Sequence, residues 1–85
     1  MISRLGIVKL SQFLRDEKKE FVLSRQVLKS GTAIGALIRE AEFGQSRLDS
    51  IHKLSISLKE ASETEYWLNI LHDTGYINDK LSASF

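Results

Sequence analysis

Residues 46–73 read SRLDSIHKLSISLKEASETEYWLNILHD, and no glycine or proline interrupts them. Their apolar residues gather into stripes when the stretch is wound as an α-helix. The whole chain has no proline and five glycines. A chain of this kind that is rich in Leu, Ile, Ala, Glu and Lys favours helix throughout, because proline is the strongest helix breaker. The sequence therefore predicts an all-α fold.

Three long helices and a tail are predicted around this stretch. The predicted elements are helices over about 3–16, 20–43 and 46–73 and a short tail over 76–85. Gly44 and Gly75 are expected to end the second and third helices, because glycine is the preferred residue just after a helix. We expect one domain, residues 1–85, in which the helices form an antiparallel up-and-down bundle.

Composition removes several classes of protein. The chain has no cysteine, so neither a disulfide-stapled secreted fold nor a thiolate zinc site is expected. An 85-residue chain buries a small core, and self-association is the remaining source of stability. No apolar run is long enough to span a bilayer or to act as a signal peptide. We therefore expect a cytoplasmic protein with no membrane partner.

Helix 46–73 carries apolar residues on two sides. At about 100° per residue, one stripe holds Ile51, Leu54, Leu58, Ala61, Leu68 and His72, and the nearly opposite stripe holds Ile56, Trp67, Ile70 and Leu71. We expect the first stripe to pack inside the bundle. So short a chain has too few helices to cover the second stripe as well. A second copy of the chain is expected to cover it, with Trp67 as the anchor.

Two glycines lie inside the predicted helix 20–43. Gly31 and Gly35 each disfavour the helix by about 1 kcal/mol relative to alanine, so another helix is expected to pack close to the backbone there. They lie beside an apolar stripe of Leu23, Val27, Ile34, Ile38 and Ala41. Because we expect the chain to oligomerise through helices 20–43 and 46–73, we place Gly31 and Gly35 in the predicted oligomer interface.

Glu65 is the most informative of three neighbouring glutamates. Glu60 and Glu63 fall on the other side of the helix, whereas Glu65 lies in the middle of the first apolar stripe. A carboxylate buried there needs a basic or hydrogen-bonding partner. The candidate partners are Arg25, Lys29, Arg39 and Tyr76. A buried ion pair that sets helix register is one interpretation, and a catalytic acid with a raised pKa is the alternative.

Other chemistry finds little support in the residues. The stretch SGTAIG, residues 30–35, lacks the spacing and lysine of a phosphate-binding loop. Asp49 and His52 give only half of the paired carboxylate and histidine pattern of a di-metal bundle. No serine stands in a nucleophile-elbow motif. We expect no catalytic residue, metal, cofactor or small-molecule substrate.

Basic residues are unevenly distributed along the chain. Up to residue 53 there are ten Lys and Arg against six Asp and Glu, and after it two against five. Arg25, Lys29 and Arg39 share the side of helix 20–43 away from its apolar stripe, within about 80°. Together with Lys18, Lys19, Arg47 and Lys53 they predict a surface that binds the phosphates of RNA or DNA. A solvated helix face is the alternative.

Two stretches carry a family resemblance. VLKSGTAIGALIREA, residues 27–41, followed by KLSISLKEASETEYWLNILHDTGYI, residues 53–77, resembles the small bacterial four-helix-bundle proteins of the 23S rRNA intervening-sequence type. The accessory proteins of diversity-generating retroelements are similar to that family. The resemblance spans about residues 18–78. The matching positions are Lys29, Ser30, Gly31, Ile34, Glu40, Leu58, Glu63, Glu65, Leu68, Gly75 and Tyr76.

This resemblance implies an up-and-down bundle that assembles as a homopentamer, with a fourth helix largely missing here or supplied by a neighbour. Ala33 and Leu37 stand where the family usually has serine and asparagine, so a polar network there is expected to differ. The accessory proteins bind nucleic acid and a reverse transcriptase through basic surfaces, and the resemblance supplies no catalytic residue. We therefore hypothesise a non-enzymatic oligomer that binds nucleic acid. The alternatives are an interaction scaffold without nucleic acid and an acid-dependent enzyme that uses Glu65.

Overall fold

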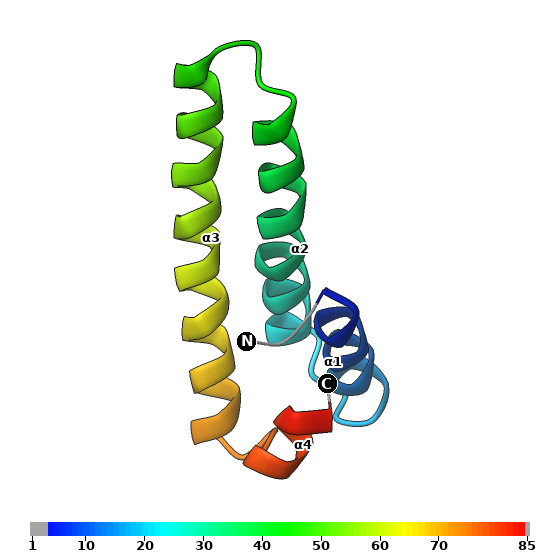
Figure 1. The fold of residues 1–85 in the computed structure, drawn as a ribbon. Coiled ribbons are helices and arrows are strands. Elements are labelled where there is room, and N and C mark those ends of the chain that lie inside the picture. Colours follow the sequence, from blue (N-terminus) through cyan, green and yellow to red (C-terminus); the bar gives the residue numbers. More distant parts are fainter. Residues whose placement is uncertain (1–3, 85) are drawn as a thin grey trace.

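The computed structural model describes residues 4–84, and within that range the chain is helical with no strand. The elements are α1 (Arg4–Asp16), α2 (Val22–Glu42), α3 (Arg47–Asp73) and α4 (Asp79–Ser84). The predicted all-α bundle is confirmed. Figure 1 shows α2 and α3 side by side along most of their length, with α1 beside one end of α2 and α4 at the foot of the molecule.

Local side chains mark the ends of the helices. The Ser46 hydroxyl accepts the backbone N–H of Asp49 at 3.0 Å, which caps the start of α3. Gly75 has a φ of 85°, a conformation that a residue with a Cβ rarely adopts, and its N–H donates to the His72 carbonyl at 3.1 Å. The tail then turns, and the Asn78 side chain accepts the Leu81 N–H at 2.7 Å. We expected the tail to be too short for a helix. This cap allows it to form α4.

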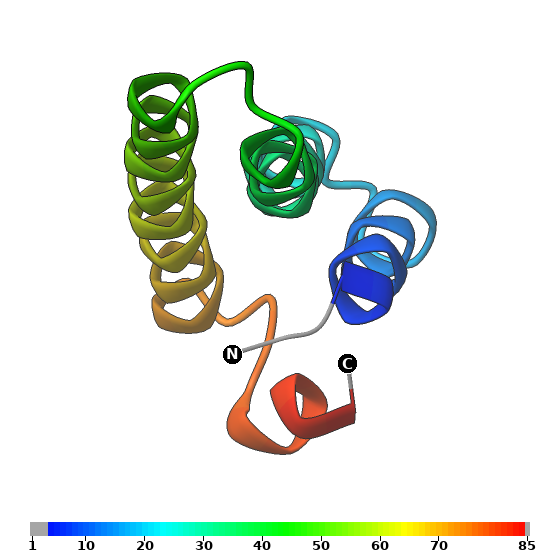
Figure 2. The ribbon, with the colours of Figure 1, turned by 45° about the horizontal axis from the view of Figure 1, so that its top comes forward.

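Small polar side chains hold the three long helices together. The Thr64 hydroxyl of α3 donates to Ser30 of α2 at 3.0 Å, and the Ser57 hydroxyl donates to the Ile34 carbonyl at 3.2 Å. On another side of α2, the hydroxyls of Ser24 and Ser11 of α1 lie 2.9 Å apart. Because these side chains are short, the helix backbones approach closely. The helix α2 therefore lies between α3 and α1 (Figure 2).

The hydrophobic core gathers at the end of the bundle that α1 covers. Its buried members are Ile7, Leu10, Leu14, Val27, Leu71 and Ile77. Trp67, Leu68 and Leu81 pack against them from α3 and α4. Beyond α1, the other half of the α2 and α3 pair has a thinner core. Among residues 4–84, the short α4 stands on the fourth side (Figure 2).

Gly31 is close to another helix, as we predicted, but the neighbour is within the chain. A Cβ added to Gly31 would lie 2.7 Å from Cγ2 of Ile7 in α1, and Gly31 is buried. Its place in the predicted oligomer interface is therefore wrong. Gly35 is exposed, and a Cβ there would meet no atom within 4 Å.

The two apolar stripes of α3 are exchanged relative to our prediction. Leu71 is fully buried and Trp67 packs against the core, while Ile56 and Ile70 are half-buried. Leu71 and Trp67 pack within the chain, so their assignment to a subunit contact is wrong, whereas the assignment of Ile56 and Ile70 stays a prediction. Ile51, Leu54 and Leu58 of the other stripe are exposed by 48%, 46% and 74%. The physical reason is the position of two short side chains, Ser57 and Thr64. On the helical wheel they lie next to Leu71, and they allow α2 to approach α3 on that side.

Candidate nucleic-acid interface

One face of α2 is exposed, and one edge of it borders α1. The buried residues of α2, Ser24, Val27, Ser30, Gly31 and Ala41, face α1 and α3. The opposite side is exposed, and we call it the outer face of α2. Its residues are Arg25, Lys29, Thr32, Ala36 and Arg39. No Asp or Glu occurs between Val22 and Arg39, so this face carries positive charge alone over most of its length.

The three cations of the outer face are exposed, and none of them forms an ion pair with a carboxylate of residues 4–84. Within residues 4–84, neither Arg25 nor Lys29 forms an ion pair. The Arg39 guanidinium lies 5.8 Å from the centroid of the Phe43 ring, over its face. A cation whose charge is not neutralised by a neighbouring carboxylate remains available to a phosphate. The structure therefore brings Arg25, Lys29 and Arg39 together as predicted, on one surface.

The other four predicted cations lie apart from this face. Lys18 and Lys19 are exposed in the turn between α1 and α2, and Lys18 lies 5.8 Å from the Phe13 ring centroid. Arg47 is exposed at the start of α3, beyond the far end of α2. The Lys53 ammonium lies 3.5 Å from a Glu40 carboxylate oxygen. Lys53 is therefore half-buried in an ion pair between α3 and α2 and does not extend the outer face.

Sequence reasoning missed Arg4 as a neighbour of the outer face. A shallow groove of about 380 Å³ runs between α1 and α2, and Arg4 and Arg39 lie at its edges. Gly35 lines the same groove. Arg15, also on α1, forms an exposed pair with Asp16 at 2.7 Å. The hydrogen bond from Arg15 lowers the pKa of Asp16, so Arg15 is already neutralised in this structure.

Two exposed phenylalanines lie at the ends of α2, and we also missed these. Phe21 directly precedes the helix and is 56% exposed, and Phe43 directly follows it and is 74% exposed. Phe21 lines a small hollow with Arg15 and Arg25. The available signal was their spacing, because Phe21 lies four residues before Arg25 and Phe43 lies four residues after Arg39.

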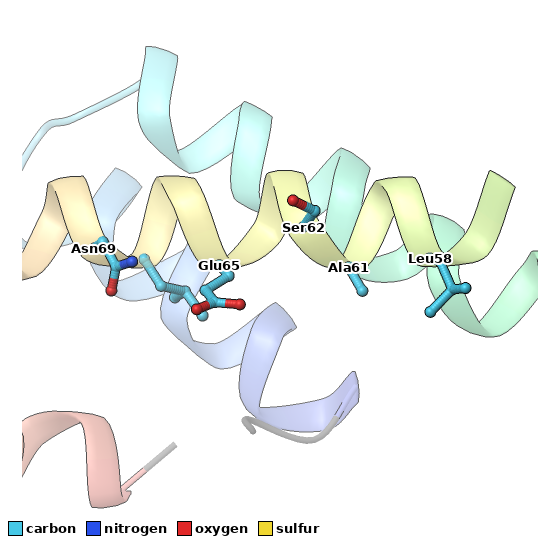
Figure 3. Close-up of a pocket in the computed structure, with 6 residues that line it drawn as sticks. Leu58, Ala61, Ser62, Glu65 and Asn69 are labelled. Carbon is cyan, nitrogen blue, oxygen red and sulfur yellow. The ribbon is translucent and has the colours of Figure 1, made fainter. Parts of the chain in front are cut away.

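Glu65 is exposed, so the prediction that it is a buried polar residue is wrong for the single chain. It lines a surface hollow of about 470 Å³ on α3, together with Leu58, Ala61, Ser62, Leu68 and Asn69. Figure 3 shows Glu65 and Asn69 on the same side of the helix. Within residues 4–84 Glu65 forms no ion pair. Its candidate partners Arg25, Lys29 and Arg39 lie on the outer face of α2, away from this hollow.

The described part of the chain offers no cluster of three or more His, Asp and Glu that could hold a metal ion. His72 is instead used in a contact between helices, since its Nε2 lies 3.0 Å from Asp79 of α4. Asp49 is used at the start of α3, where its carboxylate accepts the Gln45 N–H at 3.3 Å. None of the helices between residues 4 and 84 is both long and apolar enough to cross a membrane.

The chain is similar to a family of proteins and to a solved structure. The model of a family described as 23S rRNA-intervening sequence protein matches residues 3–85. A solved structure from Bacteroides thetaiotaomicron VPI-5482, described as a protein with unknown function from the S23 ribosomal protein family, is 58% identical with a TM-score of 0.90. The match covers 95% of this chain and 72% of that one. No protein of curated function matches.

Proposed function

Since the chain belongs to the 23S rRNA-intervening sequence protein family, and its described relative has no stated function, we propose from its surfaces that it is a non-enzymatic protein that binds nucleic-acid phosphates. The outer face of α2 is the proposed contact. The observation that carries the proposal is that Arg25, Lys29 and Arg39 are exposed on one side of a helix that has no carboxylate between Val22 and Arg39.

The spacing of the cations suits a polyanion better than a single phosphate. Along a helix axis, Arg25 and Lys29 are about 6 Å apart and Lys29 and Arg39 about 15 Å apart. No one small anion reaches all three, whereas a nucleic-acid backbone carries phosphates at such intervals. If a duplex is the probe and three phosphates are neutralised, the logarithm of the affinity falls with the logarithm of the salt concentration with a slope of about −2.7.

Fluorescence anisotropy of labelled RNA and DNA tests this proposal. A slope of about −2.7 means that raising the salt from about 50 mM to about 200 mM weakens duplex binding roughly fortyfold. Replacing Arg25, Lys29 and Arg39 together with glutamine is expected to abolish this dependence on salt. The matched control replaces three exposed lysines elsewhere, Lys9, Lys59 and Lys80, with glutamine. Equal loss in both triple variants would mean that net charge, not the outer face, causes the binding. No binding at about 50 mM salt would remove the proposal.

A second candidate function, a self-associating scaffold, is favoured by the exposed apolar stripe of α3. We define this stripe as Ile51, Leu54 and Leu58. Leu58 is 74% exposed, and Ile51 and Leu54 are about half exposed. An uncovered stripe of this length is typical of a surface that meets a partner, and in this proposal the partner is a second copy. Light scattering that gives a mass above that of one chain, with no nucleic-acid binding, would support the scaffold over the first proposal.

A further inference from the structure

Phe21 and Phe43 are exposed although phenylalanine is among the residues most often buried. Both rings lie at the ends of the helix that carries the outer face. At about 100° per residue, Phe21, Arg25, Arg39 and Phe43 fall within about 40° of one another around α2. Phe21 keeps helical backbone angles, with φ −96° and ψ −26°. The rings therefore continue the basic surface at both of its ends.

Phe43 lies beside a guanidinium group, and Phe21 lines a hollow together with arginines. Arg39 stands over the Phe43 ring at 5.8 Å from its centroid. Phe21 shares a hollow of about 190 Å³ with Arg25 and Arg15. Such a pair places a flat apolar surface next to a positive charge. A nucleotide offers the matching pair of groups, a flat base and a phosphate, and proteins that bind single strands combine these two kinds of contact.

The arrangement of rings and cations along α2 suits a single strand rather than a duplex. In a duplex the bases are stacked on one another, so a surface ring does not reach a base face. In a single strand the bases are free to stack on aromatic side chains. From residue 21 to residue 43 the helix rises about 33 Å, with Arg25, Lys29 and Arg39 between the rings. A single strand that follows α2 therefore meets a stacking surface at each end and cations along the way.

We infer that the ligand of the outer face of α2 is single-stranded nucleic acid, with bases stacked on Phe21 and Phe43. This inference rests on the proposed function and narrows its ligand. A second copy of the chain could instead cover the rings, because exposed phenylalanines also anchor protein contacts. The proximity of both rings to arginines, and the absence of any Asp or Glu between Val22 and Arg39, favour the polyanion.

Anisotropy with one labelled 20-nucleotide DNA, free and annealed to its complement, tests the inference. The double variant Phe21→Leu/Phe43→Leu keeps apolar side chains and removes the rings. We expect the single strand to bind it at least about fivefold more weakly for each ring lost, because stacking of one base contributes about 1–3 kcal/mol. Duplex binding is expected to stay within about twofold. Tyr66→Leu is the control, since Tyr66 is 58% exposed on α3, about 160° around that helix from Thr64.

The outcomes separate this inference from the proposed function. If the unchanged protein binds neither form, both fail. If it binds both forms and the Phe variants weaken them equally or not at all, only the inference fails. Circular dichroism checks that the variants fold, and each single Phe variant repeats the measurement if the double variant does not. A fall in the mass of the free protein by light scattering in either Phe variant would place the rings in a subunit contact and overturn the inference.

Discussion

Gly31→Ala and Gly35→Ala form a matched pair, because each adds one methyl group to the interior of α2. In a helix, alanine is favoured over glycine by about 1 kcal/mol. At Gly35 the new Cβ meets no atom within 4 Å, so we expect the free energy of unfolding to rise by about 1 kcal/mol. At Gly31 it would lie 2.7 Å from Cγ2 and 3.1 Å from Cδ1 of Ile7.

Ile7 has little room to move, since it is 2% exposed and its branched side chain is stiff. Overpacking of this kind costs about 1–3 kcal/mol, which offsets the gain in helix propensity. Gly31→Ala should therefore be less stable than Gly35→Ala by about 1–3 kcal/mol. In a domain of this size each kcal/mol shifts the melting temperature by about 4–8 °C.

Urea unfolding followed by far-UV circular dichroism measures the difference, at a low protein concentration to limit self-association. Ile7→Ala removes the atoms that Gly31→Ala would meet, so in that background the two alanine variants should become equally stable. Equal stability of Gly31→Ala and Gly35→Ala in the unchanged background would refute the close approach of α1 to α2.

Three further changes examine α3. Leu58→Arg alters a side chain that is 74% exposed, so we expect the free energy of unfolding of the single chain to change by less than about 0.5 kcal/mol. The mass from light scattering should fall, and an unchanged mass would remove Leu58 from any subunit contact. Thr64→Val removes the hydroxyl that donates to Ser30 and should lower the free energy of unfolding by about 1 kcal/mol, as read by urea unfolding; no change would show that this hydrogen bond contributes nothing net. Trp67→Ala removes a side chain packed on the core and should cost about 3 kcal/mol; a variant that loses mass but keeps its stability would return Trp67 to a subunit contact.

Much of the fold could be predicted from local signals. The absence of proline and the positions of Gly44 and Gly75 indicated where helices run and end, and α2 and α3 fall within the predicted ranges 20–43 and 46–73. The common side of Arg25, Lys29 and Arg39 also followed from helical periodicity alone. The tail was expected to be too short to form α4, although Asn78 is a preferred residue at a helix start and its side chain accepts the Leu81 N–H.

The structure brings only some of the cations of the predicted basic surface together. Lys53 was counted with the basic surface, but it faces Glu40 across the contact between α3 and α2. Arg4 was missed because it belongs to another helix. Phe21 and Phe43 lie inside the predicted helix 20–43, but only basic residues were considered for this surface. A helical wheel compares residues within one helix, so it does not indicate which side chains of different helices become neighbours.

Periodicity and helix breakers, which act over a few residues, were enough to establish four features: the helical class, the helix ranges, the two apolar sides of α3 and the basic side of α2. Packing between helices determined which apolar side of α3 is buried, and so placed Leu71 inside and Glu65 outside. Both sides are apolar enough to be buried. The short side chains Ser30, Ser57 and Thr64 let α2 and α3 approach and hydrogen-bond on one side, whereas Leu54 and Leu58 are left exposed on the other.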